Sequence, residues 1–129
     1  LEIFISLFLL NLFSYLKRLK LLKIDVEGME INVLRGGADL IKRTRPILYL
    51  ENDRIDKSES LIDYIFSCDY KLFWHTPPMY NPNNFYGNSI NFFEKTYSCN
   101  MLGIHRSLNI CPKGFLEILD SSYHPFRKK

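Results

Sequence analysis

Two short apolar runs, both ending in acidic or amide side chains, constrain the fold of this 129-residue chain most strongly. The first run, LLKIDV at residues 21–26, is followed at once by Glu27 and Gly28. The second, ILYLEN at residues 47–52, begins after an intervening segment of about twenty residues. That length suits a helical crossover and is too long for a tight hairpin. The pattern predicts a β-α-β unit with parallel strands and a right-handed connection.

The segment between the two runs has the spacing of an amphipathic helix. Apolar side chains recur at a period of about 3.6 between residues 29 and 43. Gly36-Gly37 interrupts this stretch, and a glycine in a helix interior costs about 1 kcal/mol relative to alanine. The helix therefore either breaks there or packs its backbone close to a neighbour. Pro46 ends the segment, because a residue that precedes proline disfavours the helical region.

Polar side chains stand where both predicted strands end. In open α/β sheets, ligands bind beyond the carboxyl ends of the strands, so we expect Asp25, Glu27, Glu51 and Asn52 to share a crevice. The alternative is that such acids only cap a following helix or face water. We favour a functional role for the acids at 25 and 27, although periodicity alone leaves both interpretations open. For Glu30 and Asp39, on the predicted helix, we favour the structural interpretation, in which the acids cap a helix or face water.

Downstream residues extend the same alternation of helices and strands. Asp56 and Glu59 resemble a capping box at the start of a second helix, with an acid in place of the usual Ser or Thr. The pattern predicts further strands at residues 70–75 and 99–106, and a closing helix around residues 115–119.

The stretch TPPMYNPNNFYGNS, residues 76–89, is predicted to be a long loop. It contains three prolines and four asparagines, and Tyr80, Phe85 and Tyr86 lie within it. Loops of this length without regular structure tend to be functional or disordered. The aromatic side chains favour an ordered lid or a wall of a substrate site.

Residues 3–16 are apolar at eleven of fourteen positions, and the basic cluster KRLK follows them. As a helix, this stretch would rise about 21 Å, which is less than the roughly 30 Å of a bilayer core. A signal peptide has its positive charge before the apolar stretch, not after it. A buried helix is the favoured interpretation. A membrane anchor with a basic flank and an artefactual start of the chain are the alternatives.

Composition argues against several classes of protein. The net charge of +3 is mild and is concentrated towards the chain ends, whereas nucleic-acid-binding domains are more basic and have a basic stripe on one face. Cys68, Cys99 and Cys111 are widely spaced, which favours reduced thiols in a cytoplasmic protein. Neither these cysteines nor the three histidines have metal-ligand spacing, so we expect no metal site.

The run KIDVEGMEINVLRGGADLIKRTRPILYLEN, residues 23–52, closely resembles the core signature of the FkbM family of S-adenosylmethionine-dependent methyltransferases. In that family an Ile-Asp-Val-Glu-Gly strand end, a Val-Leu-x-Gly helix and an Arg-Pro-led strand ending in Glu follow in this order. LFWH, NPNNFYGN and NMLGIHR resemble downstream elements of some members. The resemblance covers roughly residues 21–107.

The resemblance implies an α/β fold with a class I methyltransferase (Rossmann-like) sheet and S-adenosylmethionine across its strand ends. It further implies O-methylation of a hydroxyl on a sugar or natural-product acceptor. Carried over by position, Asp25 and Glu27 would line the reaction centre, with Asp25 also at the cofactor, and a carboxylate there can orient the hydroxyl or accept its proton. Glu51 and Asn52 would position the acceptor, and Asn84 with its aromatic neighbours would form a wall around it.

In class I methyltransferases a glycine-rich turn after the first strand holds part of the cofactor, and residues 1–20 contain no glycine. The resemblance therefore implies the C-terminal half of such a sheet, in a truncated enzyme. We expect an apolar helix of uncertain origin at 1–20, the methyltransferase half at 21–107 and a tail at 108–129. The alternative is a non-catalytic remnant that acts as an interaction module, because a half-sheet would expose an apolar edge and favour self-association.

Overall fold

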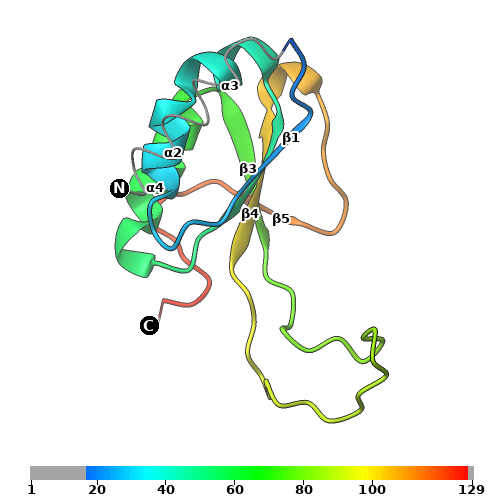
Figure 1. The fold of residues 1–129 in the computed structure, drawn as a ribbon. Coiled ribbons are helices and arrows are strands. Elements are labelled where there is room, and N and C mark those ends of the chain that lie inside the picture. Colours follow the sequence, from blue (N-terminus) through cyan, green and yellow to red (C-terminus); the bar gives the residue numbers. More distant parts are fainter. Residues whose placement is uncertain (1–16, 128–129) are drawn as a thin grey trace.

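The computed structural model of the protein describes residues 17–127 (Figure 1). The helix expected at residues 3–16 lies outside these residues. The described chain forms a mixed five-stranded sheet with three α-helices, an architecture compatible with a Rossmann-like fold. Within 17–127, no helix is long and apolar enough to cross a membrane.

The predicted β-α-β unit is confirmed. Strand β1 (Leu21–Ile24) pairs in parallel with strand β2 (Ile47–Glu51), and the segment between them is helical. The helix breaks at Gly37, as one of the two alternatives predicted, into α2 (Glu30–Gly36) and α3 (Ala38–Thr44). Arg45 then adopts a left-handed conformation (φ 48°) and directs the chain through Pro46 into β2.

The rest of the sheet is antiparallel. Its strands follow one another in the order β1-β2-β4-β3-β5, and β4 runs antiparallel to both of its neighbours. The remaining elements are α4 (Ile55–Ser67), β3 (Tyr70–His75), β4 (Asn100–His105), the short 3₁₀ helix η1 (Arg106–Leu108) and β5 (Leu116–Ile118). Placement of these strands in the C-terminal half of a larger sheet stays a prediction.

Two local expectations were wrong. The stretch expected as a closing helix forms β5, because Leu116, Glu117 and Ile118 alternate and pair with the free edge of β3. Helix α4 begins at Ile55, so Asp56 lies in its first turn and not at the N-cap, and no side chain caps the helix. An acid in the first turn still interacts favourably with the positive end of the helix dipole.

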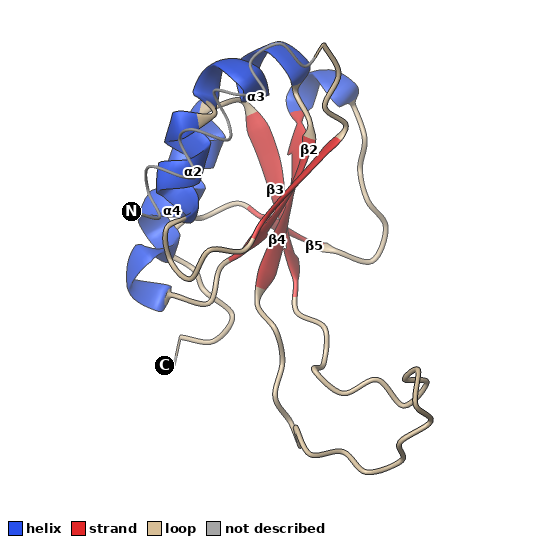
Figure 2. Ribbon diagram, in the orientation of Figure 1, coloured by secondary structure: helices blue, strands red, loops and turns tan. Residues whose placement is uncertain are grey.

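The helices cover one face of the sheet (Figure 2). Because side chains alternate along a strand, every second residue faces these helices and forms the core. The buried apolar residues on this face of the sheet are Ile24, Leu48, Leu50, Tyr70, Leu72, Trp74, Met101 and Ile118. Strand β1 lies at an edge of the sheet formed by the described residues, and Ile24 is the one buried residue of its four.

The opposite face of the sheet is more polar. Lys23, Tyr49 and Leu102 are register partners on this face, and each is partly or fully exposed. The segment that follows η1 passes over part of the face, where residues 109–111 lie near Lys71 and Ile104. The polar strand ends described below open onto the same face.

A long loop between β3 and β4 projects from the end of the sheet (Figure 1). An isolated bridge between Pro78 and Tyr97 closes its base. Beyond this bridge Phe85 is 96% exposed and Tyr86 is 90% exposed, and their rings meet edge to face. The loop expected from the sequence is therefore confirmed, and its role as a lid or substrate wall stays a prediction.

Gly103 tests the packing at the centre of the sheet. It lies between Leu48 and Leu72 of the neighbouring strands, and a Cβ there would stand 3.1 Å from the Leu48 Cβ and 3.2 Å from the Leu72 Cδ2. We expect Gly103→Leu to lower the free energy of unfolding by about 1–3 kcal/mol, because overpacking forces the strands apart. Gly103→Ala should lower it less, and denaturant unfolding measures both. Equal stability of Gly103→Leu and the wild type would contradict this packing.

Candidate functional site

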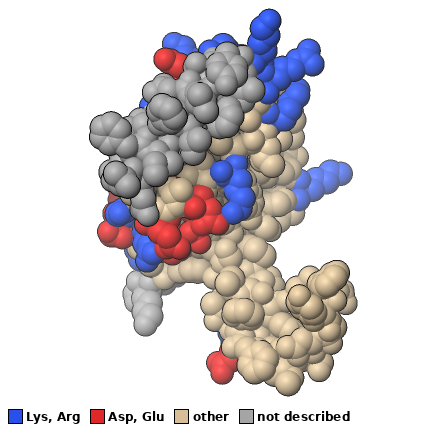
Figure 3. Space-filling model, viewed as in Figure 1, with Lys and Arg blue, Asp and Glu red and all other residues tan. Residues whose placement is uncertain are grey.

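Three carboxylates converge at the carboxyl ends of β1 and β2. One oxygen each of Asp25, Glu27 and Glu51 lies within 4.8 Å of the others. In Figure 3 acidic side chains form a compact patch with basic side chains beside it. The prediction that parallel pairing would bring these residues together is confirmed for these three; we refer to them as the carboxylate cluster.

A strained turn after β1 places the first two acids. Glu27 (φ 52°) and Gly28 (φ 88°) both adopt left-handed conformations, which are unfavourable for a residue such as glutamate. The amide of Gly28 donates to the Glu30 Oε1 at 2.9 Å, and its carbonyl accepts from the Lys57 Nζ at 3.0 Å. The structural interpretation expected Glu30 to cap a helix or face water, but it does neither. Glu30 is only 6% exposed, and it holds the turn by accepting the hydrogen bond of the Gly28 amide.

A side chain at position 28 would also come close to residues at the start of α4. A Cβ there would lie 3.0 Å from the Lys57 Nζ and 3.2 Å from the Arg54 Cγ. These two residues come from the start of α4, so the helix packs directly against the turn. The geometry of the carboxylate cluster therefore depends on α4 as well as on the two strands.

Basic residues offset part of the negative charge. The Lys23 Nζ donates to the Asp25 carboxylate at 2.7 Å, and the Arg54 guanidinium pairs with Glu27 at 2.5 Å and with Asp53 at 3.5 Å. The hydrogen bond from Lys23 lowers the pKa of Asp25, which keeps this carboxylate ionised. Surface ion pairs of this kind add little stability, so their main effect is to orient the carboxylates.

Glu51 differs from Asp25 in its protonation. Burial, followed by the negative charges of Asp25 and Asp53, raises its pKa to about 7. Its Oε2 atom is buried, and no hydrogen-bond partner for it is found among residues 17–127. Close to neutral pH, Glu51 therefore exchanges a proton readily next to an ionised Asp25.

Asn52 follows Glu51 but lies inside the protein. Its side chain is buried, and its amide donates to the Ser58 Oγ at 2.9 Å and to the Met101 Sδ at 3.2 Å. The backbone carbonyl of Asn52 accepts a hydrogen bond from the His124 Nε2 at 2.9 Å. This bond ties the C-terminal tail to the end of β2. The contacts of Asn52 in the structure thus fix the strand end, and its expected contact with a substrate stays a prediction.

Asn84 organises the projecting loop. Its amide donates to the carbonyls of Asn81 and Asn88, at 3.1 and 2.7 Å, and its side-chain oxygen accepts from the Asn88 amide at 3.0 Å. All the hydrogen bonds of its side chain found in the described part of the chain stay within the loop. The structure does not join Asn84 to the carboxylate cluster, and its role in acceptor binding stays a prediction.

Sequence reasoning missed two polar residues on the same sheet face as Glu51. The Tyr49 hydroxyl lies 2.7 Å from the His75 Nδ1, across the width of β4. Tyr49 is two residues before Glu51 in β2, so strand alternation alone would have placed the two on one face. His75 could be found only from the tertiary pairing.

The carboxylate cluster suits two kinds of chemistry. A carboxylate pair with unequal pKa values can orient a hydroxyl group and accept its proton. Three oxygens of this spacing are also the ligand type that hard divalent cations prefer. No metal site is expected from the spacing of His and Cys in the sequence, whereas these three acids come together only through strand pairing.

Comparison with protein families gives one match. The model of the family described as "Methyltransferase FkbM domain" matches residues 5–72. The matched range contains the carboxylate cluster and ends within β3, whereas the resemblance noted in the sequence extends roughly from residue 21 to 107. Neither the search of curated proteins nor that of solved structures found a match.

The raised pKa of Glu51 predicts a pH-dependent stability. Between pH 4.5, its ordinary pKa, and about pH 7, folded Glu51 holds a proton that the unfolded chain has released, so the folded state loses stability as the pH rises. We expect Glu51→Gln to unfold with a free energy about 1 kcal/mol higher than the wild type at pH 8, and with a similar one at pH 4.

Denaturant unfolding at both pH values measures the difference. The matched control is Glu59→Gln on α4, outside the carboxylate cluster, which should follow the wild-type profile. A Glu51→Gln curve parallel to the wild type at all pH values would show that Glu51 is not held in its protonated form.

Proposed function

The chain belongs to the FkbM methyltransferase family, and we propose that it transfers the methyl group of S-adenosylmethionine to a hydroxyl of a sugar or natural-product acceptor. The observation that supports this reaction is the carboxylate cluster at the ends of two parallel strands. Ligands of open α/β sheets bind at this end of the strands.

Asp25 and Glu51 are the proposed reacting pair. Methyl transfer to oxygen requires an aligned hydroxyl and a group that takes its proton. Asp25, whose pKa is lowered by Lys23, stays ionised and can orient the hydroxyl by accepting its hydrogen bond. Glu51, whose pKa of about 7 matches neutral pH, is the better proton acceptor of the two. Glu27, held by Arg54, completes the negative wall of the site.

The carboxylate cluster would fit a cationic methyl donor at the part of the site that these residues line. S-adenosylmethionine supplies an activated methyl group on a positively charged sulfur. The clustered carboxylates favour positive charge nearby, and Asp25 is the residue proposed to contact the cofactor.

The projecting loop is the proposed acceptor wall. It leaves β3 and returns to β4 at the end of the sheet where β2, which is antiparallel to β4, delivers Glu51. Exposed aromatic rings such as Phe85, Tyr86 and Phe92 offer apolar faces against which a sugar ring or a natural-product scaffold can stack. Asn84 would act by holding the loop in shape.

Asp25→Asn tests the proposal directly. It removes the carboxylate that is proposed to orient the hydroxyl and keeps the shape of the side chain. We expect formation of S-adenosylhomocysteine with an acceptor to fall by about 10²-fold, because the hydroxyl is no longer aligned with the methyl group. Asp39→Asn, on the exposed surface of α3, is the matched control and should keep full turnover. Equal turnover of Asp25→Asn and the wild type would refute the assigned role.

Calorimetric titration with S-adenosylmethionine separates catalysis by this chain from a family fold without activity. A measurable heat of binding supports the proposal. Absence of heat at millimolar cofactor would exclude activity of the isolated chain and favour the second candidate, an interaction module.

The exposed edge of the sheet favours that second candidate. Strand β1 pairs with β2 alone within residues 17–127, and Leu21 is 56% exposed. An open strand edge is a template for pairing with another chain. Sedimentation should then show a dimer that Leu21→Pro dissociates, because the Leu21 amide points away from β2 and proline removes this donor from the open edge. If the protein sediments as a monomer at all concentrations, self-association through β1 is excluded.

A further inference from the structure

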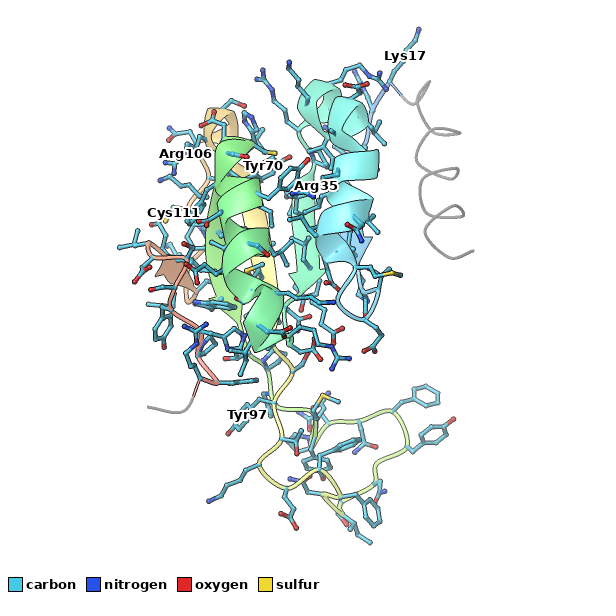
Figure 4. The ribbon with its side chains drawn as sticks, turned by 90° about the vertical axis from the view of Figure 1, so that its left-hand side faces the viewer. Lys17, Arg35, Tyr70, Tyr97, Arg106 and Cys111 are labelled. Carbon is cyan, nitrogen blue, oxygen red and sulfur yellow. The ribbon has the colours of Figure 1, made fainter. Side chains whose placement is uncertain are left out.

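A groove lies at the end of the sheet opposite to the carboxylate cluster. It has a volume of about 440 Å³ and lies between α3 and the C-terminal part of α4. Figure 4 shows Tyr70 between α4 and the α2–α3 pair, where it forms part of the floor with Leu48. Arg45, on the rim, precedes Glu51 by six residues, which corresponds to roughly 20 Å along an extended strand. The groove is therefore separate from the proposed reaction centre.

The body of the groove is apolar. Ile41 and Ala38 of α3 form one wall, and Tyr64 and Cys68 at the end of α4 form the other. The hydroxyl of Tyr70 is already bonded, because it donates to the Pro46 carbonyl at 2.9 Å. The floor therefore offers an apolar surface, and the volume lies in the range of small-molecule sites.

The rim of the groove has two basic residues for which the described part of the chain provides no acidic partner. Lys42 lies in the last turn of α3 and Arg45 is the C-cap residue of that helix, and both line the groove. No salt bridge found within residues 17–127 joins either of them to an acid, and the Arg45 guanidinium bonds only the Ser107 hydroxyl, at 3.3 Å.

The acid on the rim is already compensated. Asp69 lies 3.6 Å from the Arg106 guanidinium and 4.0 Å from His105. The charge left for a ligand is therefore positive, and it comes from Lys42 and Arg45 on the rim of an apolar groove. The charge pattern selects an amphipathic anion.

We propose that this groove is a second ligand-binding site, which takes a small organic carboxylate with an aliphatic or aromatic body. The apolar body packs on Leu48 and Tyr70 between the two helices. The carboxylate head lies at Lys42 and Arg45, and the fork of the arginine suits a planar carboxylate. The site is independent of the methyl-transfer chemistry, since it shares no residue with the carboxylate cluster.

Titration with octanoate tests the proposal, followed by amide NMR shifts of the ¹⁵N-labelled chain. We expect saturable shifts at residues that line the groove, such as Ala38, Ser67 and Cys68. Octylamine, which has the same body and the opposite charge, should not saturate these shifts. Absence of saturable shifts with octanoate, or shifts confined to the aromatic loop at 76–99, would overturn the proposal.

Three variants locate the contacts. Lys42→Gln should weaken octanoate binding about threefold, as expected for an exposed charge pair. Lys113→Gln, an exposed lysine outside the groove, is the matched control and should leave it unchanged. Ala38→Trp fills the mouth from an exposed position and should abolish binding, with folding checked by circular dichroism. Equal weakening by the two lysine variants, or full affinity of folded Ala38→Trp, would place octanoate elsewhere.

Discussion

The parallel pairing of β1 with β2 is the constraint on which the site depends. It brings Asp25 and Glu51 to one end of the sheet, where their charges repel and Glu51 is partly buried. The protein limits that cost in two ways. Lys23 pairs with one carboxylate, and the other holds a proton up to about neutral pH. Like charges in close contact commonly divide in this way into an ionised and a protonated partner.

The turn at Glu27 and Gly28 is the second element of this arrangement. Two consecutive left-handed residues are stable only where their surroundings hold them, and here Lys57 and Glu30 bond the backbone of Gly28 from either side. The strained backbone therefore lies within the carboxylate cluster, since Glu27 belongs to it. The opposite end of the sheet is built differently, with an apolar groove and uncompensated basic residues. One sheet thus presents two surfaces of contrasting charge.

Particular residues show how far sequence reasoning reached. The two apolar runs with their polar ends were enough to predict the parallel unit and the meeting of three carboxylates. The short β5 was mistaken for a helix because three residues give no reliable period, and only the free edge of β3 decides their conformation. Asn52 was grouped with the acids because it is adjacent in sequence, but its contacts with Ser58 and Met101 depend on how α4 packs.

The sequence by itself determined the family, the alternation of strands and helices, and the residues at the strand ends, because these follow from local periodicity and from side chains adjacent in the chain. The tertiary structure alone decided the proton on Glu51, the pairing of Glu27 with Arg54 and the contact between Tyr49 and His75. The groove between α3 and α4 is likewise a feature that only the tertiary structure decided. Each of these depends on burial or on distances between segments far apart in sequence, and such distances exist only once the chain has folded.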